Sequence, residues 1–417
     1  MPAPPEPALS PHEARHVAAV ALFVVFLDMV SLGMIIPVLP RLVAEVGHVG
    51  LDGAAAAGGW LFAVFSLAQF LCAPFMGTLA DHIGRRPLLL LAIGGLALDY
   101  VIQALAPSLT WLFAGRMLAG VCGSSYVIAN ACLADVTAPE RRARAFGWTT
   151  AAFGLGFVLG PAIGGLLGTV GTRVPFWCAS ALAGANFLLG ACVLPETLRP
   201  ENRRRFRWRD ANPLGSLLVF RSLPGVLPMA MILGLYFFGS SIYMAIWPYW
   251  GIAKFGWSTT TVGVTLATSG LSMALLQGLA TGPAVARWGE KPVAVAGLAV
   301  AASACVAFSL ARTTELVVLL LVVHAIEGFV HPMLTALMSS TVPEDSQGAL
   351  QGGISAIMNL AMLAGTIFFT QIFGFFLPPQ APFASPDVPF HAAATILAVT
   401  LVLFLHQTRT RTTSSPH

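Results

Sequence analysis

Twelve long apolar runs constrain the fold of this chain more than any other feature. Each run is about twenty residues long, the length that an α-helix needs to cross a hydrocarbon layer about 30 Å thick. Hydrophobic residues make up 57% of the 417 residues and charged residues only 10%, a balance too apolar for a soluble protein of this size. The runs predict membrane spans at residues 17–40, 56–79, 87–106, 111–134, 145–168, 175–194, 225–250, 259–284, 292–311, 315–340, 349–376 and 387–406.

The spans are predicted to be helices. Only α-helices and closed β-barrels pair every backbone polar group inside a bilayer. A barrel needs segments of about ten residues with alternating polarity, and the sequence has none. The sequence therefore predicts an all-α integral membrane protein with about twelve transmembrane helices.

The Lys and Arg residues gather in every second break between spans. This asymmetry places those breaks, and both termini, in the cytoplasm. The net charge of +4 then reports membrane topology, and we expect no nucleic-acid partner. The basic residues of these breaks are Arg85, Arg86, Arg141, Arg142, Arg144, the run from Arg199 to Arg209, Arg287, Lys291, Arg409 and Arg411.

Enzymatic and cofactor-binding motifs are missing from the sequence. It has no GxxxxGK[ST] phosphate loop, no HExxH motif and no nucleophile elbow, so neither ATP use nor catalysis is expected. The six cysteines all fall in apolar spans without a CxxC pair, which is typical of packing residues. We expect no catalytic residue, cofactor or resident metal.

A long polar break divides the spans into two related sets of six. It predicts an N-terminal bundle at residues 1–194, a basic cytoplasmic linker at 195–224 and a C-terminal bundle at 225–417. Matching landmarks recur 205 residues apart at Gly77 and Gly282 and at Gly84 and Gly289, and 204 apart at Pro139 and Pro343. Duplicated six-helix units predict a pseudo-symmetric secondary transporter with its substrate site between the halves.

The break after the second span reads Gly77-Thr-Leu-Ala-Asp81-His-Ile-Gly84-Arg85-Arg86-Pro87. It resembles the signature G-x-L-a-D-r-x-G-r-[KR] of the major facilitator superfamily. The resemblance implies a gating role for its two glycines, its acid and its two arginines, together with an acid at the end of the fourth span, here Asp135. The second copy lacks the acid, because Ala286 stands in its place.

Two further motifs lie within spans. Arg116, in Gly115-Arg116-Met-Leu-Ala-Gly120, resembles the R-x-x-x-G motif of the superfamily, and its charge predicts a partner or a water-filled cavity, unless it snorkels to the interface. Span five resembles the glycine-rich motif C of proton-coupled antiporters, which favours export and a gating role, although ordinary close packing would also use its glycines. Its motif residues are Gly156, Gly160, Pro161 and Gly164.

Nearly the whole chain resembles the tetracycline/proton antiporter family. The resemblance implies a monomer in the bacterial inner membrane that exports a small amphipathic solute in exchange for protons by alternating access. The family's acid in span nine and His in span eight are replaced by Ala301 and Met273, which suggests a different solute. A proton-coupled symporter, a receptor and a lipid flippase remain alternatives. The matching segments are Asp28-Met-Val-Ser-Leu-Gly33, Leu98-Asp99-Tyr100, Phe146-Gly-Trp148, Phe255-Gly-Trp257, Arg287-Trp-Gly-Glu-Lys291 and Gln347-Gly-Ala-Leu-Gln-Gly352.

Five ionisable groups inside spans are candidate proton carriers. Asp28 and Asp99 lie within apolar sequence, where desolvation favours a neutral, protonated carboxyl group. Alternatives are a helix-end contact for Asp28 and a structural hydrogen bond for Asp99. His324, Glu327 and His331 are spaced to share one helical face, and this cluster could replace the acid missing at Ala301. A buried ion pair, with Arg116 or another base, is the alternative, and a metal site is not favoured because one helix orients its ligands poorly.

Polar and aromatic residues within the spans are candidate substrate contacts. Sites for amphipathic molecules are mostly apolar with a few polar groups. The alternative role for the amides is hydrogen bonding between helices. The candidates are Gln69, Tyr100, Gln103, Asn130, Tyr243, Trp247, Gln277, Thr335 and Asn359.

Overall fold

The fold is a set of long helices. The structure is a computed structural model, and it describes residues 11–138, 141–203, 205–206, 212, 215, 220, 223, 225–343 and 346–413. Within these residues the regular elements are helical, and twelve stretches are long and apolar enough to cross a membrane, one for each predicted span. The predicted all-α membrane fold is confirmed. Large apolar side chains such as Leu188 and Leu279 are 62% and 73% exposed, as expected of surfaces that face lipid.

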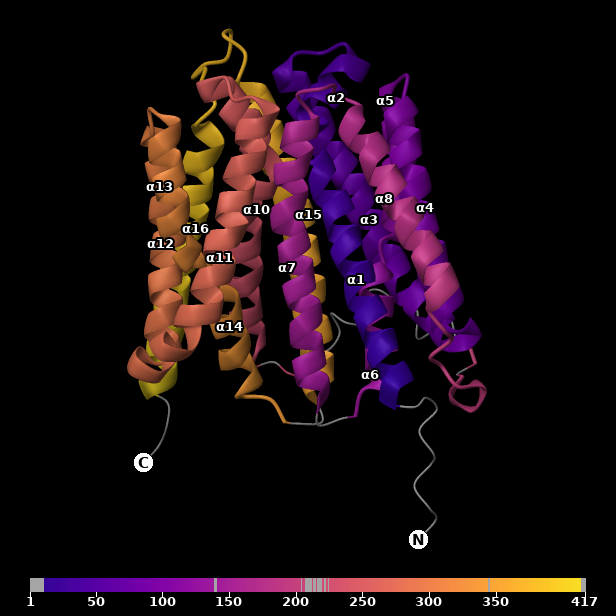
Figure 1. Cartoon of the computed structure of the whole chain (residues 1–417). Coiled ribbons are helices and arrows are strands. Elements are labelled where there is room, and N and C mark those ends of the chain that lie inside the picture. The colour runs from indigo at the N-terminus through magenta and orange to yellow at the C-terminus, as the bar shows by residue number, and fades with distance from the viewer. Residues whose placement is uncertain are drawn as a thin grey trace. The chain divides into compact units, whose positions relative to one another are not determined.

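Internal contacts divide the chain into two units. Unit 1 holds residues up to Val38 and Leu67–Pro213, and unit 2 holds Leu39–Ser66 and the residues from Leu214 onward. The helices of each unit lie lengthwise beside one another (Figure 1). The predicted boundary at residues 195–224 stays a prediction, because much of that segment lies outside the described residues.

The helices of unit 1 pack around α1 and α4. Leu88, Leu89 and Ile93 of α4 are buried against Val24 of α1 in its core. The elements are α1 (Pro11–Ile35), the second part of α3 (Leu51–Ile83), α4 (Arg85–Leu105), α5 (Leu109–Cys122), α6 (Ser125–Val136), α7 (Arg142–Leu167), α8 (Val174–Val193) and η2 (Pro200–Asn202).

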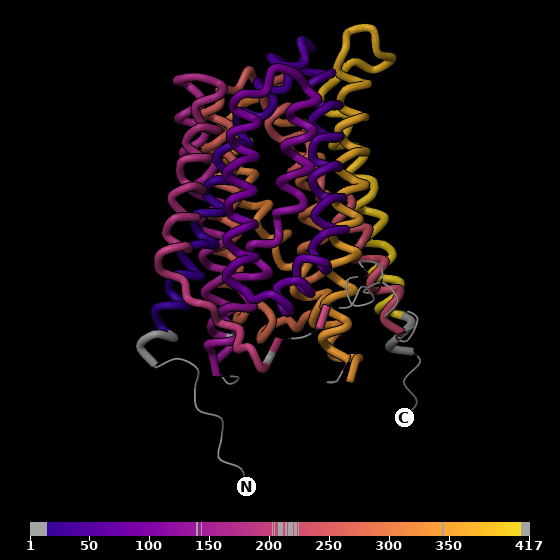
Figure 2. Tube along the Cα trace, turned by 90° about the vertical axis from the view of Figure 1, so that its right-hand side faces the viewer, coloured from indigo at the N-terminus to yellow at the C-terminus, as the bar shows by residue number. Residues whose placement is uncertain are grey.

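Unit 2 packs around α10 and α12. Its elements are α2 (Leu39–Gly47), the first part of α3, α10 (Leu227–Phe255), α11 (Thr259–Trp288), α12 (Glu290–Leu310), α13 (Thr314–His324), η3 (Ala325–Phe329), α14 (Val330–Ser339), α15 (Gln347–Phe376) and α16 (Val388–Thr413). The connection between α15 and α16, yellow at the top of Figure 2, extends beyond the helix ends. Its last residue, Asp387, accepts hydrogen bonds from Lys254 Nζ at 2.9 Å and from Trp250 Nε1 at 2.7 Å. These bonds tie the end of α10 to the start of α16.

Helix boundaries repeat with the spacing found in the sequence. Helices α4 and α12 each have 21 residues, and each follows a glycine with positive φ, 121° at Gly84 and 79° at Gly289. Only glycine adopts such a φ without strain. The predicted pseudo-symmetric repeat is therefore confirmed in the backbone. The third landmark, Pro139-Glu140, lies outside the described residues, as does Glu344 of its counterpart.

Three predicted spans differ in detail from the structure. The first was expected to continue to residue 40, but α1 ends at Ile35 and α2 starts at Leu39, because Pro37 has no N–H for a helical bond. Span four is interrupted between α5 and α6 at a Gly123-Ser124 pair, a common cause of helix breaks. Span ten is interrupted by the 3₁₀ segment η3.

Glycines allow α7 to lie directly against α1. A Cβ atom added to Gly160 would lie 2.7 Å from Gly33 Cα, and one added to Gly156 would lie 2.7 Å from the Phe26 carbonyl oxygen. A Cβ on Gly164 would overlap the Met34 backbone. Even one methyl group would push the two helices apart. The predicted glycine face of span five thus forms a helix contact within unit 1.

Replacing Gly160 with Ala is expected to destabilise the protein by about 1–3 kcal/mol, because the methyl group overlaps α1. Gly154 of the same helix is the matched control, since a Cβ atom there meets no atom within 4 Å. The Gly154→Ala change should alter stability by less than about 0.5 kcal/mol. Thermal unfolding of the detergent-solubilised variants measures both. Equal shifts in the two variants would contradict the close contact.

Candidate functional site

Asp28 is buried in the C-terminal half of α1. Its side chain is only 3% exposed and accepts a hydrogen bond from the hydroxyl of Ser125, the first residue of α6. Asn186 of α8 donates to the Val24 carbonyl oxygen one turn earlier, at 3.2 Å. Together with the α7 contact, these bonds fix the position of the carboxylate. A membrane helix with a buried, ordered carboxylate is a typical proton or ion site.

Asp99 and Arg116 form a buried ion pair between α4 and α5. Arg116 Nη2 lies 2.5 Å from Asp99 Oδ2, and Gln103 Nε2 donates to the same oxygen at 2.7 Å. Both charged side chains are at most 8% exposed. The charge of Arg116 in an apolar span predicted a partner. In the structure that partner is Asp99, which also belongs to unit 1.

Charged groups at the end of α3 form a compact network, which we call the α3–α4 turn network. Arg85 Nη1 lies 2.5 Å from Asp81 Oδ1, and Arg85 Nε lies 3.4 Å from Asp135 Oδ2. Thr197 Oγ1 donates to the same Asp135 oxygen at 3.2 Å. The predicted gating acids and Arg85 therefore lie together. Of the other predicted residues here, Arg86 Nη2 donates to the Ala191 carbonyl oxygen at 2.6 Å, and Gly77 has room for a side chain.

Glu196 belongs to this network, although the sequence predicted only that it lies at the start of the linker. Its carboxylate accepts the backbone N–H groups of Arg85 at 2.9 Å and Arg86 at 3.2 Å, the first residues of α4. It thereby caps a helix N-terminus, where a negative charge is favourable. A side chain at Gly84 would overlap the Glu196 carboxylate. The positive φ and this contact both explain the glycine.

Replacing Glu196 with Ala is expected to cost about 1–2 kcal/mol, because it removes the cap of α4. The matched control is Glu201→Ala. Glu201 is 65% exposed and lies 3.8 Å from Arg199, so its removal should have an effect near zero. Thermal unfolding measures both changes. A larger loss in the Glu201 variant would contradict the capping role.

Glu327 is the buried acid of unit 2. It is 2% exposed, accepts a hydrogen bond from the Ser240 hydroxyl of α10, and has Oε2 at 2.5 Å from His324 Nε2. The Tyr243 ring packs against the His324 ring with centroids 4.4 Å apart and planes tilted by 60°, and its hydroxyl lies 3.3 Å from Cys305 Sγ of α12. A carboxylate, an imidazole and a serine thus meet within the helix bundle.

His331 lies apart from this group. The predicted single helical face does not form, because the helix tightens to 3₁₀ at Ala325, and a 3₁₀ turn of three residues brings Glu327 back onto His324. The His331 ring packs edge-on against Phe237, with centroids 5.3 Å apart. The shared-face prediction is therefore correct for two of its three residues.

Two predicted amides hold freed backbone carbonyl groups. Gln69 Nε2 donates to the Gly123 carbonyl oxygen at 2.8 Å, and Gln277 Nε2 donates to that of Gly328 at 3.0 Å. Gly328 would normally accept from residue 332, which is a proline without an N–H. Both glutamines thus satisfy carbonyl groups at a helix interruption.

The other predicted substrate contacts occupy varied surroundings. Tyr100 is buried, and Asn130 donates to the Tyr126 carbonyl oxygen at 3.1 Å within α6. Trp247 is buried among aromatic rings and donates to Thr265 Oγ1 at 3.1 Å. Thr335 is half-buried and Asn359 is exposed. Their roles in substrate binding stay predictions.

Of the two positions that depart from the tetracycline pattern, Met273 faces Gly328 of η3, and Ala301 lies on α12 within one turn of Gly297, which faces Ile326 of η3. Met273 Cγ would lie 3.2 Å from a Cβ atom on Gly328. Ala301 is fully buried on α12, one turn from Cys305 and one turn from Gly297, at which an added Cβ would meet Val330 Cγ2 at 2.7 Å. One region of unit 2 therefore contains both replaced positions, Met273 and Ala301, and the two titratable residues His324 and Glu327.

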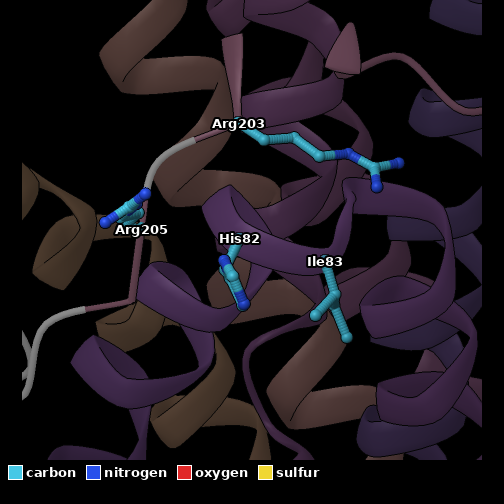
Figure 3. A pocket seen from close by; sticks show the side chains of 4 residues that line it. All are labelled: His82, Ile83, Arg203 and Arg205. Atoms are coloured by element: carbon cyan, nitrogen blue, oxygen red, sulfur yellow. The ribbon is translucent and has the colours of Figure 1, made fainter. Parts of the chain in front are cut away.

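Two pockets open near helix ends. One, about 440 Å³, is lined by His82 and Ile83 at the end of α3 and by Arg203 and Arg205 after η2 (Figure 3). The other, about 770 Å³, lies between α11 and α12 with apolar walls. Its inner wall includes Ile326 and Phe329 of η3, so it adjoins the segment that carries Glu327.

Sequence reasoning paired neither serine with its acid, and it assigned no role to Glu196. Ser125 and Ser240 carry no motif, and each meets its acid across a long sequence separation, 97 and 87 residues. The sequence did offer one signal for Glu196, because it is an acid only two residues beyond the predicted end of the sixth span.

Comparisons with known proteins place these features in a family. Residues 21–239 and 229–417 match the family described as Major Facilitator Superfamily. The tetracycline resistance protein, class C, of Escherichia coli is 38% identical, over 87% of this chain and 90% of the relative. The class G protein of Vibrio anguillarum is 36% identical, over 86% and 91%. The resemblance inferred from the motifs is confirmed.

A solved structure shares the fold. The human organic anion transporter MFSD10 superposes with a TM-score of 0.70 over 95% of this chain and all of that chain, at 23% identity. The twelve spans and the family match agree with a multi-pass protein of the inner membrane. The chain belongs to the major facilitator superfamily and is a membrane transporter related to the tetracycline resistance proteins.

Proposed function

We propose that this chain exports a small amphipathic drug-like solute in exchange for protons by alternating access. The observation that carries the proposal is the 38% identity to a tetracycline resistance protein over 87% of the chain. The glycine-rich sequence of span five, which resembles motif C of antiporters and lies against α1, supports export over uptake.

Protons are proposed to bind at Asp28, Asp99 and Glu327, with His324 and His331 as further titratable groups. Among the residues that the structure describes, these are the three carboxylates buried within spans. A buried carboxylate is costly in a membrane unless it has a partner or a function. Each has a hydroxyl, amide or cationic donor, so each can hold a charge between proton transfers.

Gating is proposed to use the α3–α4 turn network. Asp81, Arg85 and Asp135 form charge-assisted bonds near the surface, which can break and re-form with less cost than buried ones. Glu196 links this network to the segment after α8. Breaking these bonds would free the end of α3 for movement.

The solute is proposed to differ from tetracycline. Of the two substituted positions, Met273 lies against Gly328 of η3 and Ala301 lies on the neighbouring helix α12, whereas this chain carries Glu327 in η3 and His324 at the end of α13. The solute is proposed to contact the residues that the sequence singled out, above all Tyr243, whose ring lies against His324. We further propose a monomer with both termini in the cytoplasm, in agreement with the basic residues near the ends of α3 and α11.

A susceptibility panel in a bacterial host without its own efflux pumps tests the proposal. Expression should raise tolerance to tetracycline or another amphipathic antibiotic, and a protonophore should abolish the gain. In everted membrane vesicles with an acidic interior, adding that antibiotic should make the interior less acidic. Proton movement in the same direction as the solute would establish symport and overturn the proposal, as would unchanged tolerance to every compound.

A further inference from the structure

Each unit contains a broken helix at the same place in the repeat. In unit 1 the break separates α5 from α6 at Gly123, and in unit 2 it is η3, which contains Gly328. These two glycines are 205 residues apart, the spacing that also relates Gly84 to Gly289. The two breaks are therefore equivalent positions of one duplicated unit.

The same kind of donor holds both breaks. The carbonyl oxygens of Gly123 and Gly328 accept from Gln69 and Gln277, and a Cβ atom on either glycine would come within 2.8 Å of the amide. The glutamines come from α3 and α11, the second spans of their halves. An unsatisfied carbonyl group in a membrane costs several kcal/mol, so these bonds stabilise the broken conformation.

A buried acid and a serine adjoin each break, with their positions exchanged. In unit 1 the acid, Asp28, is on the first span and the serine, Ser125, follows the break. In unit 2 the serine, Ser240, is on the first span and the acid, Glu327, lies in the break. In both units the acid–serine hydrogen bond joins the first span to the broken one.

We propose that the two breaks are matching proton-dependent hinges, in which Ser125, Ser240, Gln69 and Gln277 are positioning residues. The inference rests on the proposed proton coupling and deepens it. A charged carboxylate only accepts hydrogen bonds, whereas a protonated one also donates. A proton that enters from water and binds the carboxylate oxygen removes the need for the serine to donate, and the first span then loosens from the break. Release of the proton to the other side restores the bond.

Neighbouring titratable groups differ between the hinges. Around Asp28 the structure describes Tyr100 of α4 as an electrostatic neighbour. Around Glu327 it describes His324 of α13, Tyr236 and Tyr243 of α10, and Cys305 of α12. Tyrosines and cysteines ordinarily stay neutral at pH 7 while histidine titrates there. The unit 2 hinge therefore has a second group that can carry a proton.

Infrared difference spectroscopy of the purified protein in lipid nanodiscs tests the hinges without a solute. The protonated carboxyl C=O band is followed against pH, and Asp28→Asn and Glu327→Gln identify the band of each acid. Ser125→Ala should shift the titration midpoint of the Asp28 band upward by about one pH unit, the effect of losing one hydrogen bond to a charged group. Ser240→Ala should do the same for the Glu327 band only.

Ser180→Ala is the matched control. Its hydroxyl also donates to another helix, but its acceptor is the backbone carbonyl oxygen of Ala97, at 3.2 Å, and not a carboxylate. It should leave both midpoints unchanged. Unchanged midpoints in the Ser125 and Ser240 variants, or equal shifts in all three, would overturn the hinge.

Hydrogen–deuterium exchange provides a second measurement. Gln69→Met and Gln277→Met keep the side-chain length but remove the donor, so exchange should rise in the peptides containing Gly123 and Gly328 respectively. Exchange unchanged in both peptides would also overturn the proposal. If the expected band shifts and exchange increases are observed but the protein exports no solute, the proposed function is wrong and the hinge proposal is retained.

Discussion

Replacing Glu327 with Gln is expected to reduce proton-driven export about 100-fold, the scale of losing a positioned proton-transfer group. Glutamine keeps the shape of the side chain and can still hydrogen-bond to Ser240, but it cannot bind and release a proton. Export driven by a pH gradient in everted vesicles measures the loss. Exchange of labelled for unlabelled solute without a gradient should be retained, which separates lost coupling from lost folding.

Glu315→Gln is the matched control, since Glu315 lies in the first turn of the same span and is exposed. Its export should equal that of the wild type. Full export by the Glu327→Gln variant would show that Glu327 does not carry the coupled proton.

Adding an acid on the facing helix should restore part of the loss. Ala301 is buried on α12, one turn from Gly297, which faces Ile326 of η3, so Ala301→Asp adds a carboxylate on the helix that packs against the segment carrying position 327. The double variant Ala301→Asp, Glu327→Gln is expected to recover about tenfold in export. The single Ala301→Asp variant should lose activity, because two carboxylates then compete for one proton. If the double variant recovers no export, a carboxylate at position 301 cannot replace the proton-carrying role of the one at position 327.

The spans could be predicted because their cause is local. Length and apolarity decide whether a segment crosses a bilayer, and every predicted span is present. The interruptions could not be placed in the same way. Pro332 signals that a bond is lost in span ten, but whether the helix continues depends on Gln277, which donates to the freed carbonyl oxygen of Gly328 from 51 residues away.

The site shows the same limit. Sequence indicated which residues carry charge in the membrane, since Asp28, Asp99 and Glu327 stand out against apolar neighbours. It did not indicate their partners. Asp99 meets Arg116 across a turn between α4 and α5, and Asp28 meets a serine with no distinguishing motif. Such pairings depend on how close the helices approach, which Gly156 and Gly160 set for α1 and α7.

Replacing Asp99 with Asn is expected to destabilise the protein by about 3–5 kcal/mol, the cost of removing one partner of a buried ion pair. Arg116 Nη2 would lose the carboxylate 2.5 Å away while its charge stays within the span. Arg116→Gln should cost a similar amount, since it leaves the carboxylate buried without its cation. Thermal unfolding and the yield of folded protein measure both losses.

The double variant Asp99→Asn, Arg116→Gln separates structure from transport. It removes both charges and keeps groups that can hydrogen-bond to each other and to Gln103, so stability should return to within about 1 kcal/mol of the wild type. Proton-driven export should stay about 100-fold below the wild type, because no titratable group remains at position 99. A stable double variant with full export would show that the pair only holds α4 against α5, and Asp99 would then leave the proposed proton path.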